Sequence, residues 1–132
     1  MMSARARSAA APDQRFPPAR RIRRPGEFKQ IYAAGRRLGN EFFTANAQPN
    51  ALHGARLGMS VAVRTMGSAV ARNRVRRLIR ESFRLNQSTV PPLDIIIGVR
   101  ASARDAEGAR LRASLEQLWQ KIAIQCARSC ER

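Results

Sequence analysis

The stretch AVARNRVRRLIRESFR, residues 69–84, decides the fold because its apolar residues recur at the spacing of an α-helix. When successive residues are turned by about 100°, the apolar positions share one arc: Val75, Leu78, Ile79, Ser82 and Phe83. Gly67 or Ser68 can cap the start of this helix, which can run to about Asn86. The arc predicts a helix that packs against the core of the domain.

Basic residues fill the neighbouring arc of the same helix. Its members are Arg72, Asn73, Arg76, Arg77, Arg80 and Arg84, with Glu81 at the far edge and Arg74 just beyond. Arginines four residues apart repel one another by about 0.2–0.5 kcal/mol, so folding alone disfavours this pattern. A phosphate backbone turns the repulsion into attraction and releases counterions. A merely solvated face would mix in glutamates, so the arc predicts a surface that binds nucleic acid.

Three further stretches predict β-strands. LDIIIGVR at 93–100 is almost continuously apolar and predicts a central strand buried on both faces. EFFTANA at 41–47 and RLGMSVAVR at 56–64 predict two strands joined by a turn near 49–54. We expect these two strands to pair as an antiparallel hairpin, with Leu57 and Met59 on the apolar face of the second.

Two more helices complete the predicted order of elements. Pro25 and Glu27 suit the first turn of a short helix that ends at Gly35. An amphipathic helix is expected from about residue 109 to 127. The order of helix, two or three strands, helix, strand and helix predicts an α/β domain with helices packed on a small sheet.

Length and charge set the domain count and the partner. The 132 residues allow one domain, expected over 20–127, with a disordered basic tail over 1–19 and a short tail over 128–132. Lys and Arg number 25 and Asp and Glu number 9, which gives a net charge of +16. Such a surface needs a polyanion. Nearly all the cations are arginines, which pair with phosphate through two hydrogen bonds.

Several classes of function are excluded. Two cysteines and one histidine cannot fill the four positions of a structural zinc site, and the scattered acids show no metal-carboxylate nuclease. We therefore assign no catalytic residue, no metal ligand and no cofactor. No stretch approaches the roughly 18 apolar residues of a membrane span, and the N-terminal region lacks the apolar core of a secretory signal. We expect a cytoplasmic protein without a membrane partner.

Four blocks of the sequence resemble the protein subunit of bacterial ribonuclease P. They are RRPGEFKQIYAAG at 23–35, RLGMSVAVR at 56–64, GSAVARNRVRRLIRESFR at 67–84 and DIIIGVR at 94–100. The resemblance covers roughly residues 20–126, and its R-N-R helix is far more selective than a general cluster of arginines.

The resemblance implies both a fold and a division of labour. The implied fold is an α/β (α+β) two-layer sandwich, ribosomal-protein-S5-domain-2-like, in which helices pack on a small mixed sheet with an unusual left-handed βαβ crossover. The implied partners are the catalytic RNA of ribonuclease P, one per protein, and the 5′ leader of precursor tRNA. The RNA subunit would require Mg²⁺ and cleave the leader. The protein would bind the leader and the catalytic RNA and broaden the range of substrates.

The resemblance also implies two sets of site residues. Those expected to contact the catalytic RNA are Arg72, Asn73, Arg74, Arg76, Arg77 and Arg80, with Arg56 and Arg64 from the strand. Those expected in a leader-binding cleft are Phe28, Tyr32, Phe42, Asn46 and Ser60. Helical spacing by itself would place Phe28 and Tyr32 in the core, whereas the resemblance implies rings that stack on single-stranded bases.

Three positions depart from the family pattern. Thr65 stands where a second basic residue commonly follows the strand, and Ala62 replaces a usual small hydroxyl. Asn46 stands where the cleft strand often carries an aromatic ring, which Phe42 could partly replace from the same strand face. These departures leave the R-N-R helix untouched.

Two other classes of protein share parts of this pattern. A ribosomal-protein-like binder of structural RNA, with no role in tRNA processing, would share the charge and the fold, but the R-N-R block argues against it. A helical DNA-binding protein would present an isolated recognition helix, and the predicted buried strand disfavours it.

Overall fold

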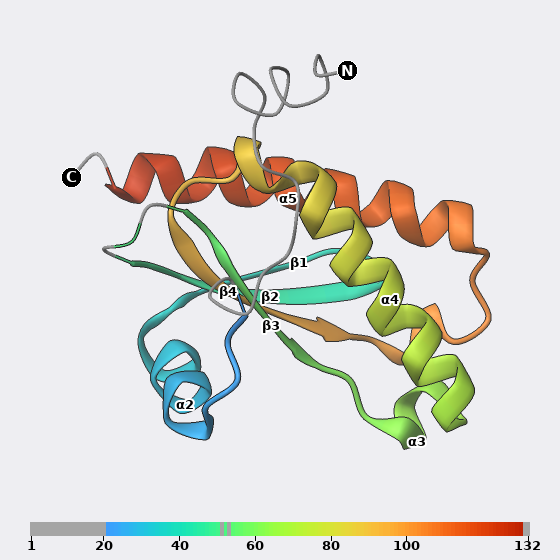
Figure 1. Cartoon of the computed structure of the whole chain (residues 1–132). Coiled ribbons are helices and arrows are strands. Elements are labelled where there is room, and N and C mark those ends of the chain that lie inside the picture. The colour runs from blue at the N-terminus through green and yellow to red at the C-terminus, as the bar shows by residue number, and fades with distance from the viewer. Residues whose placement is uncertain (1–20, 51, 53, 131–132) are drawn as a thin grey trace, which may run out of the picture.

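The computed structural model describes residues 21–50, 52 and 54–130. The expected tail over 1–19 lies outside the described residues. In chain order the elements are α2 (Pro25–Ala34), β1 (Arg36–Gly39), β2 (Phe43–Pro49), β3 (Arg56–Ser60), α3 (Val63–Met66), α4 (Ala69–Asn86), η2 (Gln87–Thr89), β4 (Leu93–Val99), η3 (Ala101–Ala103) and α5 (Gly108–Cys130). Figure 1 shows the sheet between α2 on one side and α4 with α5 on the other.

The four strands form one mixed sheet in the order β1-β2-β4-β3. β2 pairs antiparallel with β1 and with β4, and β3 pairs parallel with β4. The predicted hairpin between residues 41–47 and 56–64 is therefore wrong, because β4 lies between these strands. Both strands have an apolar face and a turn-like linker, a pattern that does not reveal a third strand inserted from later in the chain.

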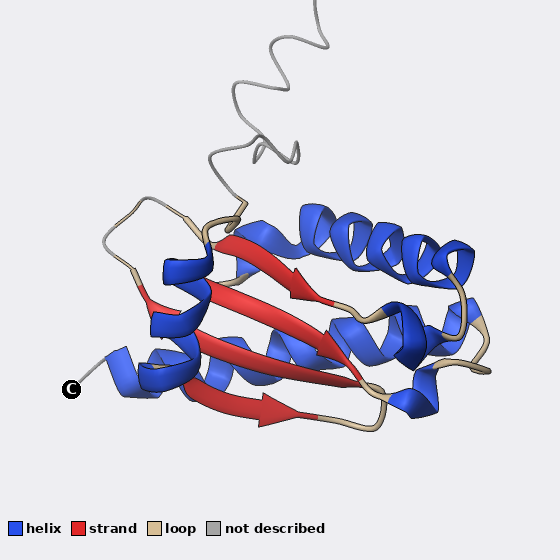
Figure 2. Cartoon of the chain, turned by 90° about the horizontal axis from the view of Figure 1, so that it is seen from below, coloured by secondary structure: helices blue, strands red, loops and turns tan. Residues whose placement is uncertain are grey.

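The chain passes from β3 through α3 and α4 to β4, its parallel neighbour. Figure 2 views the sheet from the α2 side: β3 and β4 point the same way, and α4 lies along the β3 edge on the far side of the sheet. The crossover is left-handed, against the strong general preference for the right hand. It brings the basic helix α4 alongside β3, at the edge of the sheet.

The main core lies between the sheet and the helix pair α4 and α5. Val75, Ile79, Ser82 and Phe83 of α4 are buried, which confirms the predicted apolar arc. Trp119 of α5 meets the ring of Phe83 edge-on at 5.7 Å between centroids. Its Nε1 donates a 2.8 Å hydrogen bond to Ser82 Oγ, so the one polar residue of the arc is satisfied inside the core.

A second, smaller apolar cluster lies on the opposite face of the sheet, beneath α2. It contains Ile22, Ile31 and Ile96, with Phe28 packed against it. Ile95 and Ile97 belong instead to the main core. β4 is therefore buried on both faces and central in the sheet, as its continuous apolar sequence predicts.

Candidate nucleic-acid interface

Helix α4 begins at a cap that its sequence supplies. Gly67 adopts a φ of +92°, which glycine tolerates without strain, and ends α3. Ser68 then accepts a 3.1 Å hydrogen bond from the backbone N–H of Ala71. With the apolar arc anchored in the core, the basic arc of the same helix is turned outward.

A groove of about 500 Å³ runs beside this basic arc, and we call it the basic groove. Its lining comes from the segment before α2, from α2 itself, from β3 and from α4: Arg21, Ile22, Arg23, Phe28, Leu57, Met59, Arg76 and Arg80. Partial burial lowers the pKa of the Arg76 guanidinium, and the charges of Arg72 and Arg80 lower it further. The groove thus concentrates positive charge around an apolar floor.

The predicted RNA-contacting residues of α4 do not all point into the groove. Arg76 and Arg80 line it, while Asn73 and Arg77 are exposed on the helix surface. Arg74 lies on the side of α4 that meets α5, since a Cβ added at Gly108 would stand 3.5 Å from its Nη2. Arg72 has a structural contact instead: its Nε donates a 2.8 Å hydrogen bond to Val61 O, which connects α4 to the end of β3.

The two basic residues predicted on the strand lie in different settings. The side chain of Arg56 is only 17% exposed and is ion-paired to Asp94 at 2.7 Å and to Glu27 at 3.0 Å. Its hydrogen bonds to Asp94 raise its pKa, against a smaller opposing effect of burial. Arg64 is exposed, but it lies in the short helix α3 because β3 ends at Ser60. The expectation that both side chains extend from one strand is therefore corrected.

The predicted cleft residues are divided between two faces of the sheet. Phe28 is half-buried and lines the basic groove, and Tyr32, one turn later on α2, is 47% exposed. The two ring centroids are 6.5 Å apart. Helical spacing alone would place both rings in the core, and the structure places Tyr32 at the surface. Asn46 on β2 is buried and pairs in register with Ile96, on the α2 face.

Phe42 and Ser60 differ from the expected arrangement. Phe42 precedes β2, is 4% exposed and belongs to the main core on the other face of the sheet. Arg110 lies over its ring at 5.1 Å. The prediction that Phe42 replaces an aromatic ring beside Asn46 is thus corrected, because the strand begins only at Phe43. Ser60 is exposed at the end of β3 and does not line the basic groove.

Sequence reasoning missed Arg21 and Arg23, which line the groove opposite α4. The backbone N–H of Ile22 donates a 2.8 Å hydrogen bond to Leu57 O, and Arg21 forms a parallel bridge with Leu57. The segment before α2 thus runs along the outer edge of β3. Arg21 and Arg23 are visible in the sequence just before the helix that begins at Pro25. The pairing of Arg21 with a strand residue 36 positions later is not.

Comparisons with known proteins give the same assignment from three directions. The family model described as Ribonuclease P matches residues 16–123. The chain belongs to the ribonuclease P protein family. The ribonuclease P protein component of Thioalkalivibrio sulfidiphilus is 36% identical over 117 residues, which is 89% of this chain and 98% of the relative. That of Halorhodospira halophila is 40% identical over 108 residues, covering 81% and 88% of the two chains.

Solved structures of the ribonuclease P protein have the same fold. The protein from Staphylococcus aureus aligns with a TM-score of 0.73 at 35% identity, over 79% of this chain and 94% of that one. The protein from Thermotoga maritima aligns with a TM-score of 0.71 at 31% identity, over 77% and 96%. The predicted mixed α/β fold is confirmed.

Membership of the ribonuclease P protein family fixes the general activity. The chain is part of a bacterial ribonucleoprotein endonuclease of tRNA processing, and its partner is the ribonuclease P RNA. Among the described residues, no group of three or more His, Cys, Asp and Glu side chains gathers as a metal site. Nor does that part of the chain contain a helix that is both long and apolar enough to cross a membrane.

Proposed function

We propose that this chain binds both the catalytic RNA of ribonuclease P and the 5′ leader of precursor tRNA, and that the RNA subunit cleaves the leader. The observation that carries the proposal is the basic groove, where Arg76 and Arg80 of α4 and the ring of Phe28 line one surface. Guanidinium groups suit a phosphate backbone, and a half-exposed aromatic ring suits an unpaired base. Single-stranded RNA offers both within one nucleotide.

The outward surface of α4 is the part that we assign to the catalytic RNA. Asn73 and Arg77 are exposed there, next to the groove-lining Arg76 and Arg80. Burial is the main cause of the lowered pKa of Arg76, and repulsion from Arg72 and Arg80, which is unfavourable in the isolated protein, lowers it further. Phosphate groups remove that penalty and release counterions, which makes the binding strong and dependent on salt.

The leader is assigned to the groove beside Phe28. Stacking of a base on an aromatic ring is worth about 1–3 kcal/mol and tolerates any base. Such a contact would suit leaders of variable sequence and would broaden the range of substrates. Tyr32, exposed and 6.5 Å from Phe28 between ring centroids, offers a second ring.

The chemistry of cleavage is assigned to the RNA subunit, together with the Mg²⁺ that it requires, and one protein is assigned to each RNA. The side chains of this chain would then contribute binding rather than bond breaking. In support, Glu27, which precedes the groove residue Phe28, is engaged in an ion pair with Arg56.

Cleavage of precursor tRNA by the cognate RNA subunit, with and without this chain at limiting magnesium, tests the proposal. We expect the purified chain alone to be inactive and the RNA subunit to be stimulated when the chain is added. Robust cleavage by RNA-free protein would contradict the assignment of chemistry to the RNA. Unchanged cleavage on addition of the chain would instead contradict its role in binding the leader and the RNA subunit.

A further inference from the structure

The α2 face of the sheet carries an ion-pair network that the proposed RNA contacts do not use. Arg56 Nε donates a 2.8 Å hydrogen bond to Asp94 Oδ1, and its Nη2 donates to Asp94 Oδ2 at 2.7 Å and to Glu27 Oε2 at 3.0 Å. One guanidinium therefore joins three elements: β3, β4 and α2. We call Glu27, Arg56 and Asp94 the carboxylate clamp.

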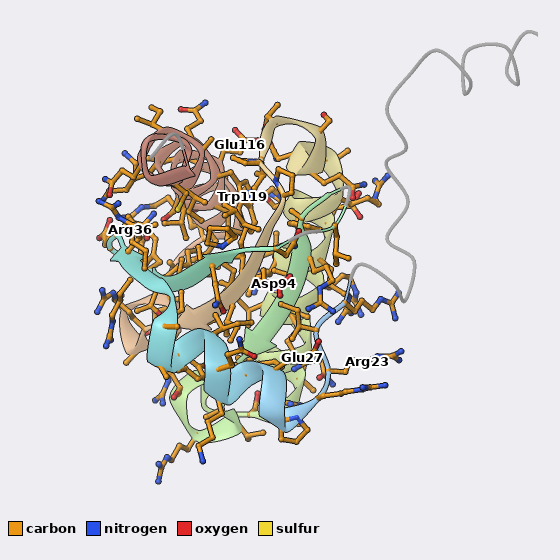
Figure 3. All side chains as sticks on the ribbon, turned by 90° about the vertical axis from the view of Figure 1, so that its left-hand side faces the viewer. Arg23, Glu27, Arg36, Asp94, Glu116 and Trp119 are labelled. Atoms are coloured by element: carbon orange, nitrogen blue, oxygen red, sulfur yellow. The ribbon has the colours of Figure 1, made fainter. Side chains whose placement is uncertain are left out.

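The sheet and a neighbouring amide fix the positions of Arg56 and Asp94 in the clamp. Arg56 and Asp94 are register partners in the parallel pair β3 and β4, so the sheet itself sets their spacing. Asn50 Nδ2 adds a 2.9 Å hydrogen bond to Asp94 Oδ1 and fixes the orientation of that carboxylate. Figure 3 shows Glu27 on α2 below Asp94 on the sheet, on the side of the molecule where Arg23 projects outward.

The clamp lies directly beside the ring assigned to the leader. Glu27 is the residue before Phe28, and Arg56 stands two residues before Gly58 on the same face of β3. A Cβ at Gly58 would lie 2.8 Å from Phe28 Cζ, so the ring rests on the bare backbone of β3. The clamp and this contact together determine where α2 holds the ring over the sheet.

We propose that Arg56 is a positioning residue, which acts through Glu27 to hold the ring of Phe28 in the leader-binding groove and does not itself contact RNA. The inference rests on the proposed role of Phe28 in leader binding. A guanidinium that is satisfied by two carboxylates and mostly buried is poorly placed to bind phosphate as well. Arg56 therefore holds α2 at a fixed position on the rigid pair of strands β3 and β4.

Glu27→Ala is the cleanest test because it releases α2 and leaves the Arg56–Asp94 pair intact. The quantity to measure is leader discrimination, defined as the affinity of the reconstituted holoenzyme for precursor tRNA divided by its affinity for mature tRNA. We expect Glu27→Ala to lower it about threefold or more. Glu27→Gln keeps a side-chain oxygen that can accept from Arg56, so it should retain most of the discrimination.

Removal of an acid also raises the net charge, and Glu116→Ala controls for that. Glu116 lies on α5, on the opposite side of the molecule from α2 (Figure 3). Its replacement changes the charge equally and should leave discrimination unaltered. Affinity for the RNA subunit should be the same in all three variants, and thermal unfolding of each protein shows that it is folded at the assay temperature.

A double variant that combines Glu27→Ala with Phe28→Ala tests whether the clamp acts by positioning the ring of Phe28. If the clamp acts through the ring, Glu27→Ala should have no further effect on discrimination once the ring is absent. Full discrimination in Glu27→Ala, with a loss in Phe28→Ala, would overturn the positioning role and leave the proposed function standing. Full discrimination in Phe28→Ala would overturn the proposed leader site itself, and the positioning role with it.

Arg56→Met tests the alternative that Arg56 binds RNA. A lost phosphate contact would lower affinity for the RNA subunit and reduce the dependence of that affinity on salt. The positioning role requires both to stay unchanged while leader discrimination falls. A reduced salt dependence would therefore overturn the inference.

Discussion

Gly58 lies where the ring of Phe28 meets β3, and this contact depends on the absence of a side chain. An added Cβ would be 2.8 Å from Phe28 Cζ and 3.2 Å from Ile22 Cβ. Gly35 is required for a similar reason at the end of α2, where a Cβ would stand 3.0 Å from Ala47 O. Close contact with neighbouring atoms, from side chains at Gly58 and from backbone at Gly35, explains both glycines, and neither needs a left-handed conformation.

We predict that Gly58→Ala moves the ring of Phe28 away from β3. Crowding of this kind typically costs about 1–3 kcal/mol of folding free energy, and the displaced ring should also bind the leader less well. Thermal unfolding and the affinity for precursor and mature tRNA measure the two effects. Unchanged values of both would show that the small cluster beneath α2 can yield without cost.

Asp94 gives the clamp a dependence on pH. Burial acts to raise the pKa of Asp94, but hydrogen bonds from Arg56 and Asn50 outweigh it, and the pKa lies below its ordinary value. The stabilisation is therefore fully present above the unfolded-state pKa of about 3.9. It is lost as the pH falls through the lower pKa of the folded protein.

We predict that Asp94→Asn lowers the free energy of unfolding at neutral pH and flattens its decline below about pH 4. The neutral amide keeps the shape of the carboxylate but removes the charge that Arg56 pairs with. Chemical denaturation at a series of pH values gives both curves. Parallel curves for the two proteins would show that this carboxylate does not contribute to acid sensitivity.

At the scale of elements, α4 packs its apolar arc into the core and contributes residues of its basic arc to the groove. The apolar arc fixes the helix against α5 and the sheet, so the basic arc can change without loss of the core. Arg72 is an exception, since its hydrogen bond to Val61 O holds the end of β3. Arg84 differs from the groove arginines in another way, because its guanidinium is paired with Glu81 on the helix surface.

We predict that replacing Arg76 and Arg80 together by glutamine weakens binding of precursor tRNA to the holoenzyme and leaves the fold intact. The slope of log affinity against log salt should fall by roughly 0.7–0.9 per lost phosphate contact. The pKa of Arg76 is lowered by burial and by its neighbours, so the isolated protein should unfold at the same or a higher temperature.

Arg84→Gln is a control on the same helix for this double variant. It removes one charge from the same helix, but from a guanidinium that already has a carboxylate partner. Its effect on the salt slope should be less than half that of the double variant, which removes two charges. An equal effect per charge removed would indicate that total charge governs RNA binding, rather than the groove.

At the scale of the whole molecule, net charge and architecture act against each other. A charge of +16 on 132 residues repels itself in the compact state. Two apolar clusters, one on each face of the sheet, hold the layers together against that repulsion. The groove lies at the edge of this sandwich, where β3 is flanked by α4 and by the segment before α2.

We predict that screening salts stabilise the free protein. Raising the concentration of sodium chloride from near zero to about 0.15 M ionic strength shortens the Debye length to about 8 Å and should raise the unfolding temperature by about 3–6 °C. The gain should be smaller in the variant that lacks Arg76 and Arg80. An unfolding temperature that does not respond to salt would show that self-repulsion is unimportant.

Local patterns were sufficient for α2, α4, α5 and the central strand, but not for the short helix α3, whose first residues were predicted as the end of a strand. The positions of α4, α5 and β4 followed from helical spacing and from a continuous apolar run, because these signals arise within one element. The partner of a strand is not local. Residues 43–49 and 56–60 look like a hairpin in sequence, yet β4 separates them in the sheet.

The sequence by itself determined that this is an α/β protein with a basic helix whose pattern matches the ribonuclease P protein. Only the tertiary structure decided which of its arginines are free to meet RNA. Arg56 and Arg76 look alike in sequence, but Arg56 is paired with acids 29 and 38 residues away, and Arg76 lines an open groove. The reason is physical: a guanidinium is available to an anionic ligand only where the fold brings it no carboxylate.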